Sequence, residues 1–135
     1  PAARRFKAES GLPVWTYTKG ALTHDEVQRI LGNSILLISL SRSDGLPASM
    51  VEAMVNGAVP IQSDSSCCNE WIEEGKGGFI VKFDDIAAVT QAVSKVLGDD
   101  KLRKAALETN RRLLLERLSP EKLRAAALLT YGSIL

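Results

Sequence analysis

The hydrophobic and polar positions of the chain follow two different periods. Four short apolar runs have the length of β-strands, at residues 14–18, 35–40, 58–61 and 79–81. The run 35–40 is the most uniformly apolar, which is typical of a parallel-sheet strand that is buried on both faces. The run 14–18 is rich in β-branched and aromatic residues, and it ends at Lys19 and Gly20.

Apolar residues at helical spacing fill the segments between the first three runs. Thr23 and Glu26 have the spacing of a capping box, which predicts a helix that begins after Thr23 and stops at Gly32 and Asn33. A second helix is predicted with Pro47 in its first turn. Its apolar stripe consists of Met50, Val51, Met54 and Val55.

The rest of the chain is predicted to be mostly helical. The predicted segments are a single turn around residues 71–72 and longer helices at 86–97, 99–118 and 120–135. Asp99 has the side chain of an N-cap, and Pro120 suits a first helical turn. Because strands and helices alternate at spacings that suit right-handed crossovers, the class is α/β with a mostly parallel sheet.

The composition bounds the kind of protein. The 135 residues are the usual size of one domain, and no apolar run approaches the ~20 residues of a membrane span. No secretory signal opens the chain, and the adjacent Cys67 and Cys68 favour neither a disulfide nor a metal site. We therefore expect a cytoplasmic protein. Because the first residue is Pro1 and not Met, we also expect an engineered or natural piece of a longer chain.

The charge balance argues against nucleic acid as a partner. The net charge is +1, which is low for a nucleic-acid binder, and aromatic residues make up 5% of the chain, which is too few for a surface on which bases stack. Residues 101–117 carry six basic and two acidic side chains. A solvated helix face and a contact with a membrane surface are both open for this run.

Candidate chemistry lies in loops that follow strands, because ligands of open parallel sheets bind beyond the carboxyl ends of the strands. Such loops follow Gly20, Leu40 and Ile61. The loop after Leu40 contains Asp44 and leads into a helix start, whose free N–H groups and dipole favour phosphate. Glu52 follows eight residues later, within reach of a ligand held there. The alternatives are an Asp-Gly turn and a helix-dipole carboxylate.

Residues 43–61 read S-D-G-L-P-A-S-M-V-E-A-M-V-N-G-A-V-P-I. This stretch resembles the E-G-F-G-x-x-x-x-E-A-M-A-x-G-x-P-V signature of retaining glycosyltransferases of family 4, the glycosyl transferases group 1. Downstream, Ser63-Asp64 and residues 69–81 resemble the family's S/T-D and E-x-I-x-x-G-x-x-G-x-L-V, and Asp84 is expected to open the next helix. The resemblance implies a Rossmann-like parallel sheet with flanking helices, the later part of a GT-B C-terminal domain.

The resemblance implies site residues by position. Asp44 takes the place of the glutamate that lies against the donor sugar, and Glu52 that of the glutamate that binds the ribose hydroxyls. Backbone N–H groups would cradle the diphosphate at Gly45, Leu46, Ala48 and Ser49. The implied reaction is transfer of a hexose from a nucleotide sugar, such as a UDP- or GDP-hexose, to an acceptor hydroxyl with retention. No cofactor and no metal are implied.

The chain departs from the family pattern in several ways. Asp44 is one methylene shorter than glutamate, Pro47 lacks the N–H of the usual glycine, and residues 65–68 replace a V-G-G-x segment. The N-terminal domain and the first strand–helix–strand unit of the C-terminal domain are not found. Residues 1–135 are therefore expected to be the nucleotide-sugar-binding part of that domain, inactive alone, with the N-terminal domain and a glycan or lipid-linked acceptor as partners.

Several alternatives remain open at this point. A non-catalytic nucleotide-sugar-binding or structural module is the second function class, whereas dinucleotide-binding and P-loop motifs are absent from the sequence. For His24 an exposed helix start is favoured over catalysis. Arg42 and Lys19 either contact phosphate or are solvated. Glu70 either acts at the donor site or caps the short helix.

Overall fold

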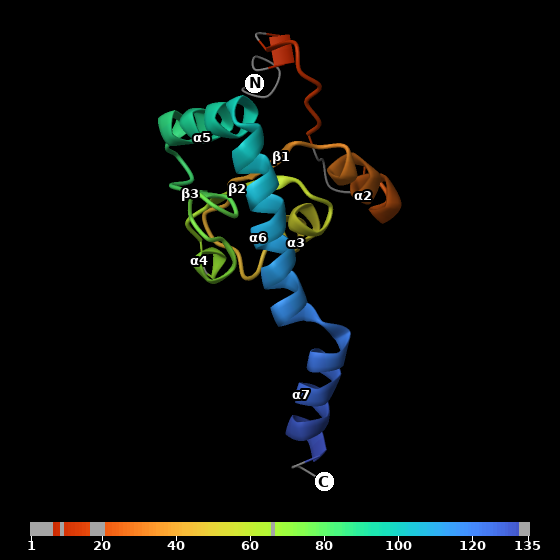
Figure 1. The fold of residues 1–135 in the computed structure, drawn as a ribbon. Helices are drawn as coiled ribbons and strands as arrows, with labels where there is room; N and C mark the ends of the chain where they lie inside the picture. Colours follow the sequence, from red (N-terminus) through yellow and green to blue (C-terminus); the bar gives the residue numbers. More distant parts are fainter. Residues whose placement is uncertain (1–6, 9, 17–20, 66, 133–135) are drawn as a thin grey trace.

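The protein folds into a three-stranded parallel sheet with helices on both faces (Figure 1). The computed structural model describes residues 7–8, 10–16, 21–65 and 67–132. Its elements in chain order are α2 (His24–Gly32), β1 (Leu36–Ser39), α3 (Ala48–Val55), β2 (Val59–Ser63), α4 (Cys68–Trp71), β3 (Phe79–Val81), α5 (Ile86–Gly98), α6 (Asp100–Leu118) and α7 (Pro120–Gly132). The predicted α/β class is confirmed.

The central strand β2 divides the core into two layers. Parallel pairing puts Ile61 of β2 between Ile38 of β1 and Phe79 of β3, in the order β1-β2-β3. Ile61 and Phe79 pack with α5 and the first half of α6 in a core that comprises Val59, Ile61, Phe79, Val81, Ala92, Val93, Val96 and Ala106. One face of the sheet is therefore covered by α5.

The other face is covered by α3, α4 and the second half of α6. Its buried cluster comprises Met50, Met54, Cys68, Ile72 and Leu114, and Ile80 of β3 packs against it. Gln62 is paired in register with Ile80, so its side chain leaves β2 on this same face. By contrast, α7 extends away from the sheet, and none of its residues is buried (Figure 1).

Side-chain caps lie at the starts of α2, α5 and α6. The predicted capping box of α2 is present, with Thr23 and Glu26 each accepting from the other's backbone N–H. Asp99 accepts from two N–H groups at the start of α6, as its side chain predicts. The prediction for Asp84 is wrong by one residue: Asp85 caps α5, because its Oδ1 accepts from the N–H of Ala88 at 2.9 Å.

Two glycines permit the turn and the approach that this topology needs. Gly57 has φ +88° where α3 turns back toward β2, a conformation that side chains with a Cβ rarely adopt. Gly78 precedes β3, and a Cβ there would lie 2.5 Å from the backbone oxygen of Pro60. β3 pairs closely with β2 because residue 78 has no side chain.

Two strand predictions are wrong. Residues 14–16 have irregular backbone, with no strand among the described residues beside them, and Trp15 is 70% exposed; residues 17 and 18 lie outside the described residues. β1 is not buried on both faces, since Ile38 is 44% exposed. The reason is position: among the described strands β1 pairs only with β2, so it forms an edge at which Leu36 still packs against the α5-side core and Ile38 does not.

Gln62 is the one glutamine in the buried layer beneath α3. It is fully buried, and neither its Oε1 nor its Nε2 has a hydrogen-bond partner among the described residues. A buried polar group without a partner costs about 1–3 kcal/mol. Gln62 therefore gives the protein a lower free energy of unfolding than an apolar side chain of the same length would give at this position.

Replacing Gln62 with methionine should raise the free energy of unfolding by about 1–2 kcal/mol, because the new side chain fills a similar volume without unpaired atoms. Urea denaturation measures this change. Gln28→Met is the matched control and should lower stability, since Gln28 Oε1 accepts from Asn56 Nδ2 at 2.6 Å. A loss of stability in Gln62→Met as large as in the control would contradict this reasoning.

Candidate functional site

The candidate site lies along the carboxyl edge of the sheet, where parallel strands all end on the same side. The segment after β1 (residues 40–47) leads into α3, and the segment after β2 leads into α4. The sequence-predicted residues 44–49 therefore stand at one edge together with the segment that follows Ser63. Hydrogen bonds and a ring contact fix the segment after β1 to this edge.

A group of serines ties the start of this segment to the central strand. Ser63 is fully buried, and its Oγ accepts from the N–H of Ser41 and donates to the carbonyl oxygen of Ser41, both at 2.8 Å. The hydroxyl of Ser65 lies 3.5 Å from those of Ser41 and Ser63. The backbone at residue 41 is thus held by the end of β2 and not by its own strand.

Arg42 takes a position that neither sequence alternative describes. Its guanidinium lies over the ring of Phe83, with 5.1 Å between the Cζ atom and the ring centroid. This cation–π contact links the segment after β1 to the segment after β3 and occupies one face of the guanidinium. Lys19, the other candidate for phosphate, lies outside the described residues.

The tip of the segment is open to solvent. Asp44, Gly45 and Leu46 are exposed, whereas Pro47 is buried and is the N-cap residue of α3 without a side-chain cap bond. Ala48 and Ser49 form the exposed first turn of α3. Their N–H groups have no carbonyl partner one turn earlier within the helix, and the helix dipole gives them a partial positive charge.

Glu52 lies one turn further along α3. Its side chain is 31% exposed, and its Oε1 is 3.8 Å from the Nδ1 of His24, whose side chain is 71% exposed. The expectation of an exposed helix start at His24 is confirmed. Its contact with Glu52 was missed, because the two residues are 28 positions apart and no local signal brings them together.

Glu52 and His24 face a hollow of about 900 Å³ between α2, β1 and residues 12–16. Most of its lining is apolar, and Ser49 also contributes. Asp44 is not among the lining residues. The structure thus brings Glu52 and Ser49 together at one hollow and leaves Asp44 outside it, on the exposed tip.

The structure also shows where the remaining sequence candidates, Cys67, Cys68 and Glu70, lie. Cys68 is fully buried in the core beneath α3, and Cys67 is half-buried; both are free thiols. Glu70 is exposed, and its carboxylate accepts no hydrogen bond within the described part of the chain, so the expected cap is not formed. Its neighbour Glu74 instead accepts from the N–H of Ile80 at 2.6 Å. In the described ranges no three His, Cys, Asp or Glu side chains group as metal ligands.

The basic run of α6 is divided between internal contacts and solvent. Arg103 donates to the carbonyl oxygens of Val96 and Leu97, and Arg112 pairs with Glu73 at 2.8 Å. The guanidinium of Arg117 lies 5.2 Å from the ring centroid of Trp71.

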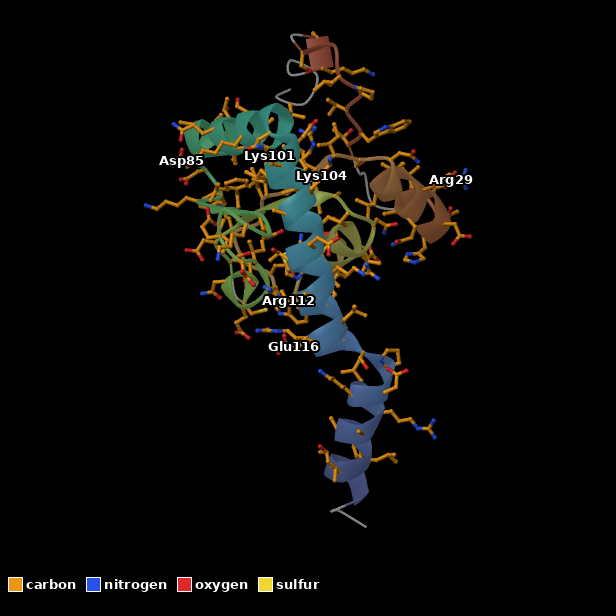
Figure 2. The ribbon with its side chains drawn as sticks, in the orientation of Figure 1. Arg29, Asp85, Lys101, Lys104, Arg112 and Glu116 are labelled. Atoms are coloured by element: carbon orange, nitrogen blue, oxygen red, sulfur yellow. The ribbon has the colours of Figure 1, made fainter. Side chains whose placement is uncertain are left out.

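The exposed basic side chains of α6 without a described partner are Lys101, Lys104 and Arg111; Figure 2 labels the two lysines along α6. None of the described helices has the length and apolar character needed to cross a membrane.

The comparison with known proteins agrees with this architecture. Residues 6–113 match the family model of the glycosyl transferases group 1. The chain therefore belongs to the glycosyl transferases group 1 family, and its activity class is glycosyl transfer. Among curated proteins, none matches the chain significantly. The helix-flanked parallel sheet agrees with the Rossmann-like C-terminal domain of the GT-B fold, and family membership implies a sugar donor and an acceptor.

Removing the hydroxyl of Ser63 should loosen the segment that carries the candidate residues. Ser63→Ala leaves the half-buried N–H and carbonyl of Ser41 without their partner, which should cost about 1–3 kcal/mol of unfolding free energy and speed amide exchange at residue 41. Hydrogen-exchange NMR and urea denaturation measure both effects.

Ser43→Ala is the control for this experiment, because Ser43 lies exposed on the same segment and makes no described hydrogen bond. Ser43→Ala should change neither the free energy of unfolding nor the amide exchange rate at residue 41. Equal behaviour of Ser63→Ala and Ser43→Ala would show that the serine contact does not anchor the segment.

Proposed function

We propose that this chain is the nucleotide-sugar-binding part of a retaining hexosyltransferase. The carrying observation is the position of Ser49 and Glu52 in the first turns of α3, the helix that follows the carboxyl end of β1; both also line the hollow beside β1. A ligand held there would meet free N–H groups, a helix dipole and a carboxylate. These groups suit a diphosphate and the vicinal hydroxyls of a ribose.

Each candidate residue has a role in this proposal. The N–H groups at Ala48 and Ser49, with the backbone of Gly45 and Leu46, bind the diphosphate of a UDP- or GDP-hexose. Glu52 accepts hydrogen bonds from the ribose hydroxyls. Asp44, on the exposed tip of the segment after β1, faces the hydroxyls of the donor sugar once the sugar is bound.

In the transfer step, the bond between the anomeric carbon and the diphosphate oxygen breaks, and the acceptor oxygen bonds to the same face of that carbon. The acceptor hydroxyl gives its proton to the departing phosphate oxygen in this step, and the nucleoside diphosphate leaves with the electron pair of the broken bond. Preorganised N–H dipoles at the helix start stabilise the charge that develops on the leaving group. No metal is required for this stabilisation.

Among the described strands β1 has a partner on one side only, which supports the proposal that this chain is part of a larger domain. Ile35, Ile38 and Leu40 are each exposed although they belong to or flank a strand. An uncovered apolar edge strand pairs readily with another strand. We propose that further strands of a GT-B C-terminal domain cover it, and that a separate N-terminal domain supplies the acceptor site for a glycan or lipid-linked acceptor, in the cytoplasm or at the membrane surface.

A second candidate function is supported by the position of Asp44. Because Asp44 is exposed, lies outside the hollow and is shorter than the glutamate of the family signature, the donor sugar could be bound without being activated. The chain would then be a non-catalytic nucleotide-sugar-binding module. Full-length protein that binds a nucleotide sugar without transferring it would favour this function.

Nucleotide affinity tests the role of Glu52. Titration of UDP and GDP into the chain by ligand-observed NMR should detect binding of at least one of them, and Glu52→Ala should weaken it by about tenfold or more, since a hydrogen bond to a charged group contributes about 1.5–3 kcal/mol. Glu108→Ala, on an exposed face of α6, is the control. An unchanged affinity of Glu52→Ala for UDP and GDP would show that Glu52 does not bind the nucleotide.

A transfer assay tests the division of labour between domains. Incubated with UDP- and GDP-hexoses and simple glycan acceptors, this chain alone should form no glycoside, because the acceptor side of the site is proposed to lie on another domain. Mass spectrometry of the products measures transfer. Robust turnover by residues 1–135 would contradict the proposal that they are only the donor-binding side.

A further inference from the structure

The contact between His24 and Glu52 belongs to a two-step ladder between α2 and α3. Asn56 Nδ2 donates to Gln28 Oε1 at 2.6 Å, and His24 Nδ1 lies 3.8 Å from Glu52 Oε1. On each helix the two contact residues are four positions apart, which is about 6 Å of helix rise. The helices therefore run in the same direction, and one contact fixes the register of the other.

Asn56 joins the ladder directly to Glu52. The same Nδ2 that donates to Gln28 also donates to the backbone oxygen of Glu52 at 2.8 Å. Beneath the polar contacts, the two helices share a buried apolar cluster of Leu31, Ala53 and Ala58, with Val27 and Leu37 packed against it. The side chain of His24 is therefore presented to Glu52 by a packed and hydrogen-bonded pair of helices.

The other charged groups of α2 do not compete for His24. Both the backbone and the side chain of Thr23 donate to Glu26 Oε2, at 2.7 and 2.8 Å, and these bonds lower the pKa of Glu26. Asp25 and Arg29 are exposed and do not line the hollow. Glu52 is the only charged residue of α3, and His24 and Glu52 are the only titratable side chains among the described residues that line the hollow.

The distance of 3.8 Å leaves the carboxylate able to bind a ligand. It is longer than a hydrogen bond but short enough for electrostatic attraction. Within the described ranges no hydrogen bond is donated to either carboxylate oxygen of Glu52. Its lone pairs therefore remain available for hydroxyl donors.

We infer that His24 is a positioning residue for Glu52, which it holds in the orientation that accepts hydrogen bonds from two neighbouring hydroxyls. The inference rests on the proposed function for the identity of the ligand, a nucleoside diphosphate with an intact ribose. Its structural half, the coupling of His24 to Glu52 through the ladder, does not. The two halves are tested by separate measurements.

The first measurement needs no ligand. It compares the side-chain carboxyl ¹³C signal of Glu52 between the unaltered chain and its variants at one pH. His24→Ala should move this signal, because the imidazole no longer lies beside the carboxylate. Gln28→Leu should move it by less, because the contact that sets the register is lost. Asp25→Asn, on the same turn as His24, is the control and should leave the signal unchanged.

The second measurement compares UDP and GDP with their 2′,3′-dideoxy forms. The unaltered chain should prefer the ribose forms, and His24→Ala should reduce this preference by about threefold or more without changing the affinity for the dideoxy forms, because only hydrogen bonds to the hydroxyls depend on the orientation of Glu52. His24→Gln, whose amide also donates to a carboxylate, should restore most of the preference.

The outcomes separate the inference from the proposed function. A Glu52 carboxyl signal that is the same in the unaltered chain and in the His24 variant would overturn the inference, whatever the nucleotide data show. A preference for ribose that Glu52→Ala removes and His24→Ala leaves intact would also overturn it while supporting the proposed function. A coupled pair in a chain that binds neither UDP nor GDP would support the positioning of Glu52 and overturn the proposed function.

Discussion

The burial of β2 is the constraint on which the rest of the structure depends. All five residues of this strand, Val59–Ser63, are buried, so it must have a neighbouring strand on each side and a helical layer on each face. Parallel pairing to β1 and β3 then brings the carboxyl ends of three strands to one edge. The segments that leave this edge, and the start of α3, are held together by the same constraint.

The end of β2 also organises the candidate site. Ser63 completes the hydrogen bonding of Ser41 from the buried side, and the ring of Phe83 packs beneath Arg42. The segment between β1 and α3 is thus fixed at its base and free at its tip, where Asp44 stands. Glu52, in contrast, lies on a helix that packs against α2 and β2, so its position is determined by the core.

Local chemistry was enough to predict most of the helices. Thr23 with Glu26, and Asp99 before α6, identify helix starts because a cap depends only on the residues of the next turn. The exposure of Ile38 could not be read from the run 35–40, since an apolar strand is buried only if another layer covers it. The choice of Asp85 over Asp84 as a cap depends on the backbone geometry of the preceding turn.

The features that the sequence did not predict depend on contacts between residues that are far apart in the chain. The pairs His24–Glu52 and Arg42–Phe83 join residues from different crossovers, and no spacing rule connects them. The burial of Gln62 without a partner runs against its polarity, so composition would have placed it at the surface. In each case the tertiary packing of α2, α3 and β3 around β2 determines the contact.

The central claim is that the start of α3, with Glu52 one turn further along the helix, forms a nucleotide site. Mapping the backbone ¹H–¹⁵N signals of the chain as UDP or GDP is added tests it most directly. The largest shifts should fall on residues 45–52 and on the first turn of α2, with α6 and α7 unaffected. Shifts confined to the basic side of α6, or no saturable shifts with either nucleotide, would contradict the claim.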